Sequence, residues 1–393
     1  MDIYEKLGIR KIINASETYT KLGGSLMAPQ TLQAMEEAAL SFIDLEELLD
    51  KVCERAALLT GNEGCFVTSG ASSGLILSVG ASMIWRSKVK QQKTEVEDYL
   101  EAFPDHEAFA CNEIVVFHGD FRDSVPYWKL IRLTGAKIVD AEPTLEGLCA
   151  AISEKTAAVA LFPAPLYERG IPTCEEVIPI CRKLGIPVIV DASAQLPPVS
   201  NLQYYTQKLG ADLVVFSGGK HLRGPQSTGM ILGKKKLTDL CRLLASPHER
   251  LGRGFKTGKE ELAGFITALG LFVETPDEER YARQEKLLKQ IAEELWRGIG
   301  NLRIDFLKEG RLGTFQPLLH VWLPEGCTAA DCGKYTRSRA VPVDVGVYTP
   351  EFGMPGNLLF LNAYNLQGEE EAKETAQAVL EYVTGLAGNW QDK

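Results

Sequence analysis

Two short apolar runs in this 393-residue chain each lead to a side chain that can do chemistry. The first run, residues 188–190, ends on Asp191; the second, residues 213–216, is followed by SGGK, whose last residue is Lys220. Runs of this length and β-branched composition, separated by a helix-length segment, are typical of parallel strands. Because such strands carry functional groups at their carboxyl ends, the pattern predicts that Asp191 and Lys220 lie at the same edge of one sheet.

A carboxylate and a lysine in this relation suit pyridoxal 5'-phosphate. The lysine amine can form a Schiff base with the aldehyde of the cofactor. The carboxylate can keep the pyridine nitrogen protonated, so that the ring accepts the electrons of a substrate carbanion. Considered alone, Asp191 could be an ordinary buried acid at a strand end, and Lys220 an ordinary solvated lysine in a loop. Their spacing and the flanking glycines favour the cofactor, and we predict that both residues are catalytic.

The turn between the predicted strand at residues 65–68 and the apolar helix at residues 75–85 is a candidate site for the cofactor phosphate. It reads SGASSG, so small side chains would let a phosphate approach the backbone. Free N–H groups and the helix dipole would point at one spot there. Many strand–helix junctions share this composition, so the prediction depends on the catalytic pair elsewhere in the chain. The whole turn, residues 69–74, is therefore the expected cradle of the cofactor phosphate, with Ser217 as a second hydroxyl donor.

Alternating strand and helix patterns predict an α/β fold with a mostly parallel, doubly wound sheet. The expected strands of this sheet are residues 65–68, 114–117, 136–139, 157–162, 188–190 and 213–216. A long helix at 276–299, strands at 319–322 and 358–361, and a closing helix at 369–383 indicate a smaller α+β unit. We therefore expect three parts: an N-terminal arm at 1–40, a large cofactor-binding domain at 41–250 and a small C-terminal domain at 251–393.

Composition restricts the partners and the compartment. The net charge of −10, from 42 basic and 52 acidic residues, argues against a general affinity for nucleic acid or anionic membranes. No apolar run has the length of a membrane span and the N-terminus does not resemble a signal peptide, so a cytoplasmic protein is expected. The nine cysteines form no CxxC pair, which favours reduced thiols over disulfides or a metal site.

A family resemblance is carried by five segments that together run through most of residues 1–270: IYEKLGIRKIINAS, VTSGASSG, VIVDASAQLPP, GADLVVFSGGKHLRGPQSTG and GRGFKTGKEEL. The chain resembles the selenocysteine-synthase-like branch of the fold type I pyridoxal-phosphate enzymes. Within that branch it is similar to the D-glucosaminate-6-phosphate ammonia-lyase-like proteins, which act on phosphorylated amino-sugar acids. The resemblance implies the aspartate-aminotransferase-like fold, with a large sheet domain and a small α+β domain.

The resemblance also implies roles for individual residues. Lys220 would be the Schiff-base lysine and Asp191 the partner of the pyridine nitrogen. The phosphate would be held by Ser69, Gly70, Ala71 and Ser217. Gln195 would lie near the phenolic oxygen of the ring. The family often stacks a histidine on the cofactor after the third strand, where this chain reads HGDFRD. His118 and Phe121 compete for that position, and His118 is preferred.

The group that binds the substrate's anionic end is an open question at this stage. Many fold type I enzymes use an arginine of the small domain for the substrate carboxylate, whereas the strand expected at 358–361 here runs into NAYN without an arginine. A basic, glycine-rich loop at 246–259 is a further candidate, and we expect it to reach the active site of a neighbouring subunit in a homodimer or larger homo-oligomer. The candidate substrate-binding residues are Asn14, Arg223, Arg253 and Lys256.

The resemblance implies a pyridoxal-phosphate-dependent lyase that eliminates ammonia or water from an amino acid, such as a phosphorylated amino-sugar acid, to give a keto acid. An amino-acid racemase and an aldolase stay open, because the shared carbanion does not define the product. A third alternative is transfer of selenium to L-seryl-tRNA(Sec). The cofactor-fold segments begin almost at the first residue, where selenocysteine synthases carry a tRNA-contacting domain, and the chain is acidic. Both features weigh against this transferase.

Overall fold

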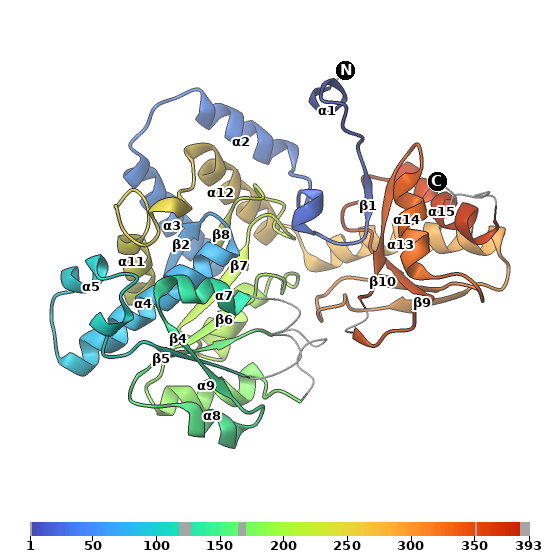
Figure 1. Cartoon of the computed structure of the whole chain (residues 1–393). Coiled ribbons are helices and arrows are strands. Elements are labelled where there is room, and N and C mark those ends of the chain that lie inside the picture. The colour runs from blue at the N-terminus through green and yellow to red at the C-terminus, as the bar shows by residue number, and fades with distance from the viewer. Residues whose placement is uncertain (1, 118–126, 164–169, 350–351, 386–393) are drawn as a thin grey trace. The chain divides into compact units, whose positions relative to one another are not determined.

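The computed structural model describes residues 2–117, 127–163, 170–349 and 352–385 (Figure 1). The chain forms two compact units, each of which is described by itself. The large unit spans Ser25–Glu274, and the small unit combines the chain up to Gly24 with the chain from Thr275 onward.

The central layer of the large unit is a seven-stranded sheet in the order β2-β8-β7-β6-β5-β3-β4. From β7 to β4 the neighbouring strands run parallel, while β8 is antiparallel to both β2 and β7. The predicted, mostly parallel sheet is confirmed. It contains one strand, β8, that the sequence analysis did not predict. The strands are β2 (Gly64–Thr68), β3 (Glu113–Phe117), β4 (Lys137–Ala141), β5 (Thr156–Leu161), β6 (Val188–Asp191), β7 (Leu213–Ser217) and β8 (Gly229–Gly233).

Helices cover this sheet because its central strands are apolar along their whole length and must be buried on both faces. The helix α4 (Ala71–Gln91) packs on β5, β6, β7 and β8 and is itself buried along most of its length. The other α-helices of the large unit are α2 (Pro29–Ala39), α3 (Leu45–Thr60), α5 (Glu97–Glu101), α7 (Tyr127–Ile131), α8 (Leu145–Ala151), α9 (Cys174–Lys183), α10 (Asn201–Gln203), α11 (Lys235–Leu244) and α12 (Lys259–Glu274).

The small unit is built on a five-stranded sheet in the order β1-β11-β12-β10-β9. Its strands are β1 (Ile13–Ala15), β9 (Arg303–Leu307), β10 (Leu318–Trp322), β11 (Val343–Val347) and β12 (Leu358–Leu361), and its helices are α1 (Ile3–Lys6), α13 (Asp277–Gly298), α14 (Ala329–Ser338) and α15 (Glu369–Val383). The N-terminal strand β1 pairs in parallel with β11, whereas the other pairs are antiparallel.

The units divide at places that differ from the expected domain limits. The sequence placed an arm at 1–40 and a boundary near 250, whereas the structure divides the chain after Gly24 and after Glu274. The helix α12 stays with the large unit because it packs against α2 and α3 and buries Leu262 and Phe265 in the large core. The N-terminal residues belong to the small unit because β1 pairs with β11 of its sheet.

Three further observations concern the described part of the chain. None of its helices is long and apolar enough to cross a membrane. It contains no cluster of three metal-ligating side chains, and all nine cysteines are free.

Candidate active site

The predicted catalytic pair lies at the carboxyl edge of two neighbouring parallel strands. Asp191 is the last residue of β6 and is paired in register with Val215 of β7. Lys220 follows β7 by three residues, in the turn that leaves the sheet at the same edge. The two groups interact, because the positive charge of Lys220 lowers the pKa of Asp191. The structure therefore brings together the two residues to which the sequence assigned the chemistry.

Asp191 is a desolvated carboxylate, with 8% of its surface exposed. Burial raises the pKa of Asp191 above its ordinary value, and this outweighs the opposing effects of hydrogen bonds from Ser193 and of the Lys220 charge. The backbone N–H of Ser193 donates to Oδ1 of Asp191 at 2.9 Å. A carboxylate in this state gains from a cationic partner, and a protonated pyridine nitrogen would supply one.

The backbone that carries Lys220 is held in place by Ser25, a residue that the sequence analysis missed. The Ser25 hydroxyl donates to the carbonyl of Lys220 at 2.6 Å, and the Ser25 N–H donates to the carbonyl of Gly219 at 3.1 Å. A Cβ atom on Gly219 would lie 2.4 Å from the Cα of Gln226, so the turn requires glycine. No local motif could have found Ser25, because its partners lie almost 200 residues along the chain.

The candidate phosphate site is the turn between β2 and α4. Gly70 adopts a φ of 102° before the first residue of the helix, and no side chain caps the N–H groups of the first turn. A Cβ on Gly229 would lie 2.6 Å from the carbonyl carbon of Gly70 and 2.7 Å from the nitrogen of Ala71, so β8 approaches the turn closely. The uncapped N–H groups and the small residues fit an anion such as a phosphate.

Two more predicted ligands can be placed at the same edge. Ser217, the last residue of β7, is the register partner of Gly229, which itself contacts the turn at Gly70. Gln195 is buried in the turn after β6, where its carbonyl accepts a hydrogen bond from the Asn201 side chain at 2.6 Å. His118 and its competitor Phe121 lie outside the described residues, and their roles stay predictions.

The candidate substrate-binding residues of the large unit are less clearly assembled. The Nε of Arg223 donates to the carbonyl of Leu26 at 2.7 Å, which occupies part of its guanidinium. Arg253 forms an ion pair with Glu249 at 2.8 Å, and both side chains are exposed. Lys256 is exposed as well. These contacts leave the predicted roles open.

Asn14 lies in the small unit, on β1, and its side chain is used locally. Its Nδ2 donates to the carbonyl of Glu17 at 2.9 Å, and its Oδ1 accepts from both the N–H and the hydroxyl of Ser16 at 3.0 Å. A side chain whose amide is satisfied in this way shapes the loop after β1. Its predicted contact with substrate stays a prediction.

The β6 and β7 ends and the β2–α4 turn together fit pyridoxal phosphate. A buried carboxylate, a lysine and an uncapped helix turn lie on neighbouring elements of one sheet, in the order β2-β8-β7-β6. Each matches one polar part of the cofactor: the ring nitrogen, the aldehyde and the phosphate. The mixed sheet and this site define the class of protein as an α/β pyridoxal-phosphate enzyme of fold type I.

Comparison with known proteins gives the family. A family model described as "Aminotransferase class-V" matches residues 110–258. The D-glucosaminate-6-phosphate ammonia lyase of Salmonella typhimurium (strain 14028s / SGSC 2262) is 32% identical over 274 residues, which are 68% of this chain and 69% of that protein. The chain belongs to the class-V aminotransferase family of pyridoxal-phosphate enzymes.

Other relatives show how the family varies. A 5'-C-glycyluridine monooxygenase-decarboxylase from Streptomyces sp is 29% identical over 74% of this chain and 70% of that protein. An L-seryl-tRNA(Sec) selenium transferase from Alkaliphilus oremlandii (strain OhILAs) is 27% identical over 73% of this chain and 60% of that protein.

A solved structure of D-glucosaminate-6-phosphate ammonia-lyase matches over nearly the whole chain. It has a TM-score of 0.77 and 25% identity, and the match covers 98% of this chain and 99% of that chain. The predicted family, fold class and cofactor are confirmed. The expected enzyme class, a pyridoxal-phosphate-dependent lyase, agrees with these relatives.

Proposed function

We propose that this chain is a pyridoxal-phosphate-dependent lyase that releases ammonia from a phosphorylated 2-amino sugar acid. The observation that carries the proposal is the Asp191–Lys220 pair beside the uncapped turn at Gly70. The choice of reaction is supported by similarity to an ammonia-lyase in both sequence and whole-chain structure. The Cβ hydroxyl of the substrate would leave as water, and the resulting enamine would take up a proton at Cβ. One water would then hydrolyse the imine to the keto acid and ammonia, so that the net change is loss of ammonia.

Each residue of the proposed site has a separate role in this reaction. Bound pyridoxal phosphate supplies an electron-withdrawing ring that acidifies the Cα–H bond of the substrate. Asp191 holds the proton on the ring nitrogen, which keeps the ring electron-poor. The Lys220 amine holds the cofactor in the resting enzyme and moves the Cα proton during turnover. The turn at Gly70 and the Ser217 hydroxyl bind the cofactor phosphate and fix its orientation.

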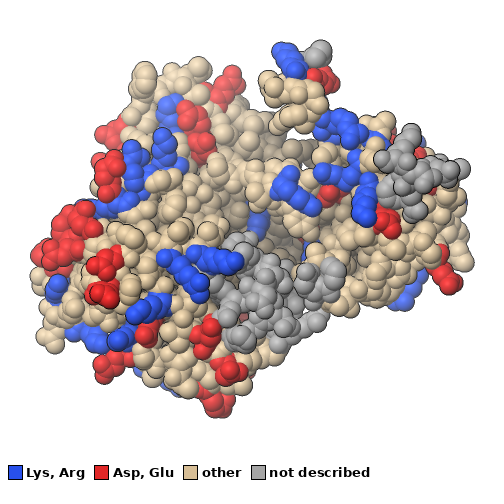
Figure 2. Space-filling view, viewed as in Figure 1, with Lys and Arg blue, Asp and Glu red and all other residues tan. Residues whose placement is uncertain are grey.

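Selenium transfer to seryl-tRNA is the alternative that the more distant relatives favour. The net charge of −10 and the surface both count against it. On the face displayed in Figure 2, acidic and basic side chains are interspersed over the large unit. A tRNA-binding surface would instead carry clustered lysine and arginine. The assay below includes this alternative.

The experiment incubates the holoenzyme in deuterated water with D-glucosaminate 6-phosphate, D-glucosaminate or L-serine. Ammonia is measured by a coupled dehydrogenase, and the products and their deuterium content by mass spectrometry and NMR. We expect ammonia and a keto acid from the phosphorylated compound, with deuterium at the former Cβ. Exchange and inversion at Cα without ammonia would define a racemase. Tight, salt-sensitive binding of seryl-tRNA without lyase activity would define the transferase.

A homo-oligomer is part of the proposal, and an apolar surface supports it. Leu40 is 82% exposed, Ile43 is 49% exposed and Phe42 is fully exposed, all in the segment that joins α2 and α3. An exposed apolar patch of this kind marks an association surface. Light scattering should give at least a dimer for the wild type and a smaller species for Phe42→Glu.

The Arg253–Lys256 loop is proposed to act across the subunits of this oligomer. Mixing the inactive variants Lys220→Ala and Arg253→Ala should then restore part of the activity in hybrid dimers. Hybrids that form and remain inactive would confine the loop to its own subunit.

A further inference from the structure

A cavity of about 490 Å³ in the large unit is lined by residues of α3, of α11 and of the first part of β2. Both helices pack against β2 (Figure 1). Because β8 is antiparallel to both β2 and β7, β2 runs parallel to β7. The first residue of β2, Gly64, therefore lies at the edge of the sheet opposite to Asp191 and Lys220, and the cavity is separate from the candidate active site.

Two cysteines of this cavity are in contact with each other. Cys53 of α3 and Cys65 of β2 both line the cavity, and Cys53 is half-buried whereas Cys65 is buried. A hydrogen bond joins their side chains. The two sulfur atoms are thus neighbours although they belong to different elements, and contact between the side chains is the first requirement for a disulfide.

The two thiols differ in access and in protonation. Burial, with a smaller contribution from the hydrogen bond to Cys53, raises the pKa of Cys65 well above its ordinary value, so Cys65 keeps its proton. Cys53 can be reached from the cavity, and the guanidinium of Arg242, which also lines the cavity, interacts electrostatically with it. A neighbouring cation stabilises a thiolate, which is the form that attacks an oxidant. Cys53 is therefore the thiol that reacts first.

Most charged side chains of the cavity are already paired. They form three ion pairs: Arg242 with Asp50 at 2.9 Å, Lys235 with Asp239 at 2.7 Å and Glu54 with Lys51 at 3.0 Å. Opposite charges at these distances compensate one another, so the cavity has little need of an ionic ligand. The two thiols are its reactive groups, and an uncharged oxidant such as hydrogen peroxide is not repelled by any charge of the lining.

We propose that Cys53 and Cys65 form a reversible redox site, at which a peroxide converts the two thiols into a disulfide that joins α3 to β2. The Cys53 thiolate attacks one peroxide oxygen: an S–O bond forms, the O–O bond breaks, and hydroxide leaves and takes up the proton that Cys53 released. The Cys65 sulfur then attacks the Cys53 sulfur: the S–S bond forms, the S–O bond breaks, and water leaves with the Cys65 proton. The thiols lose two electrons and two protons, and the peroxide is reduced to two water molecules.

The other cysteines differ from this pair in access or in neighbours. Burial raises the pKa of Cys181 and of Cys332 to about 12. Cys149 is exposed and lies outside the cavity. Cys327 is half-buried and interacts electrostatically with the buried Cys332, but neither of them lines the cavity. Cys327 and Cys332 therefore repeat the exposure of the proposed pair without its access route.

The test treats the reduced holoenzyme with hydrogen peroxide, quenches it with acid and blocks free thiols with N-ethylmaleimide before digestion. Trypsin cleaves on both sides of Cys53, so the two cysteines fall on separate peptides, 52–55 and 56–86. At a peroxide dose that oxidises half of the exposed Cys149, we expect mass spectrometry to find these peptides linked, and dithiothreitol to separate them.

Thermal unfolding and absorbance give a second readout. The disulfide closes the loop of residues 53–65 and restrains the unfolded chain, so the oxidised holoenzyme should have a Tm several degrees higher than the reduced form. The absorbance of the cofactor should not change, because the pair lies at the opposite edge of the sheet from the active site.

Cys65→Ala removes only the second thiol of the pair. Sulfenic acid on Cys53 should then persist and be trapped by dimedone, whereas the wild type forms the disulfide in its place. Cys332→Ala is the matched control, because it also removes a buried cysteine beside a half-buried one, and it should form the disulfide as the wild type does. If Cys65→Ala does not fold, Cys53→Ser replaces it and should leave peptide 56–86 unlinked and without a dimedone adduct.

Three outcomes would overturn the proposal. The first is peroxide treatment that oxidises Cys149 but leaves Cys53 and Cys65 as free thiols. The second is a Cys53 sulfenic acid that accumulates in the wild type as it does in Cys65→Ala, and the third is a link from Cys53 to any other cysteine. No substrate enters the experiment, so its result is independent of the reaction that the active site performs.

Discussion

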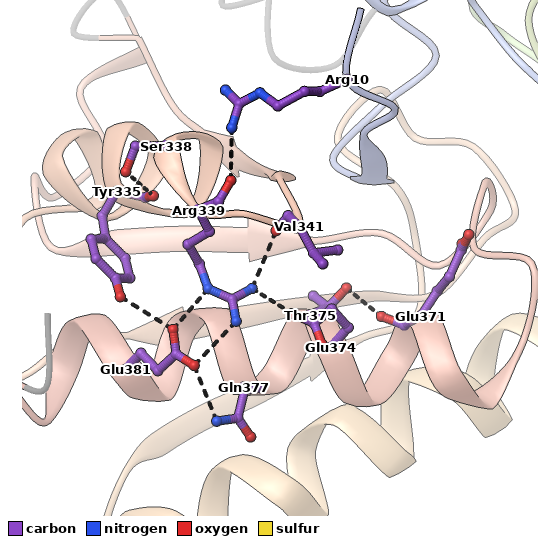
Figure 3. A network of polar contacts seen from close by, with 10 residues as sticks. All are labelled: Arg10, Tyr335, Ser338, Arg339, Val341, Glu371, Glu374, Thr375, Gln377 and Glu381. Atoms are coloured by element: carbon purple, nitrogen blue, oxygen red, sulfur yellow. Dashed lines mark hydrogen bonds and ion pairs between the residues drawn. The ribbon is translucent and has the colours of Figure 1, made fainter. Parts of the chain in front are cut away.

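Two charged sites of the molecule differ in how far the protein itself compensates the charge. At Arg339 of the small unit, an arginine is enclosed by Glu374 and Glu381 (Figure 3). At the edge of the large sheet, Asp191 is buried, accepts a hydrogen bond from the Ser193 N–H and feels the positive charge of Lys220. The first site is complete within the protein, whereas the second leaves part of its bonding capacity for a ligand.

The pKa directions express this difference. The hydrogen bonds from Arg339 lower the pKa of Glu381, because the native structure favours its charged form. Burial raises the pKa of Asp191, because the native structure disfavours its charge until a cation arrives. A charge that is paired with an opposite charge of the protein contributes to the stability of the fold. A buried charge without such a pair is available to bind a ligand of opposite charge.

The largest effect on kcat is expected for Lys220→Ala, because this change removes the amine that acts on the substrate at the Asp191 site. Loss of the general base alone costs about 10²- to 10⁴-fold in kcat. Borohydride reduction of the wild type should fix the cofactor on the peptide that contains Lys220, and mass spectrometry can locate it. Lys235→Ala, an exposed lysine paired with Asp239, is the control and should stay active. A reduced adduct on another lysine would contradict the assignment.

Asp191→Asn should separate function from stability. Loss of a charged hydrogen bond of about 1.5–3 kcal/mol corresponds to a roughly 10- to 150-fold effect, and kcat should fall by at least this much. In the cofactor-free protein the variant should be no less stable than wild type, because its neutral amide avoids the cost of burying a charge. Wild-type turnover in the variant would place the ring nitrogen elsewhere.

The pH dependence of the same variant sharpens the point. The folded pKa of Asp191 lies above its unfolded value, so ionisation favours the unfolded state. The unfolding free energy of the cofactor-free wild type should therefore decline as pH rises from the ordinary aspartate value through the folded pKa. Urea titrations across this range should show that Asp191→Asn lacks this decline. Equal slopes in both proteins would show that the carboxylate is not desolvated.

Gly229→Ala should weaken cofactor binding by deforming the phosphate turn. Its Cβ would lie 2.6 Å from the Gly70 carbonyl carbon, and overpacking of this kind costs about 1–3 kcal/mol. Fluorescence titration should give a higher Kd for pyridoxal phosphate than in the wild type. Gly270→Ala, where a Cβ meets no atom within 4 Å, is the control. Equal affinity in both variants would remove the turn from the site.

Arg339→Met should have the smallest functional effect, because its site is complete without a ligand. Two partly buried carboxylates lose their partner, so we expect a loss of about 1–3 kcal/mol in stability with kcat unchanged. The pKa of Glu381 is lowered in the folded state, so its contribution is present above the ordinary glutamate value and is lost as pH falls through the folded pKa. Urea unfolding of Arg339→Met at several pH values measures both effects. A fall in kcat at unchanged stability would give Arg339 a functional role.

The catalytic elements could be predicted because their signals are local. Asp191 and Lys220 each follow an apolar strand within a few residues, and the glycine-rich turn at Gly70 joins a strand directly to its helix. Parallel strands place such ends at one edge of a sheet whatever the rest of the chain does. The closing helix, predicted at 369–383, is Glu369–Val383 in the structure, because its apolar positions repeat with helical spacing.

The features that sequence could not supply join distant parts of the chain. The pairing of β1 with β11 connects residues some 330 positions apart, and it moves the N-terminal strand into the small unit. The hydrogen bond from the Ser25 hydroxyl to the Lys220 carbonyl likewise joins residues 195 positions apart, so no local spacing in the sequence could reveal it. The sequence by itself determined which groups can hold the cofactor, since strand ends and tight turns are local. Only the tertiary structure decided which charges remain unmatched, since that depends on what packs around each one.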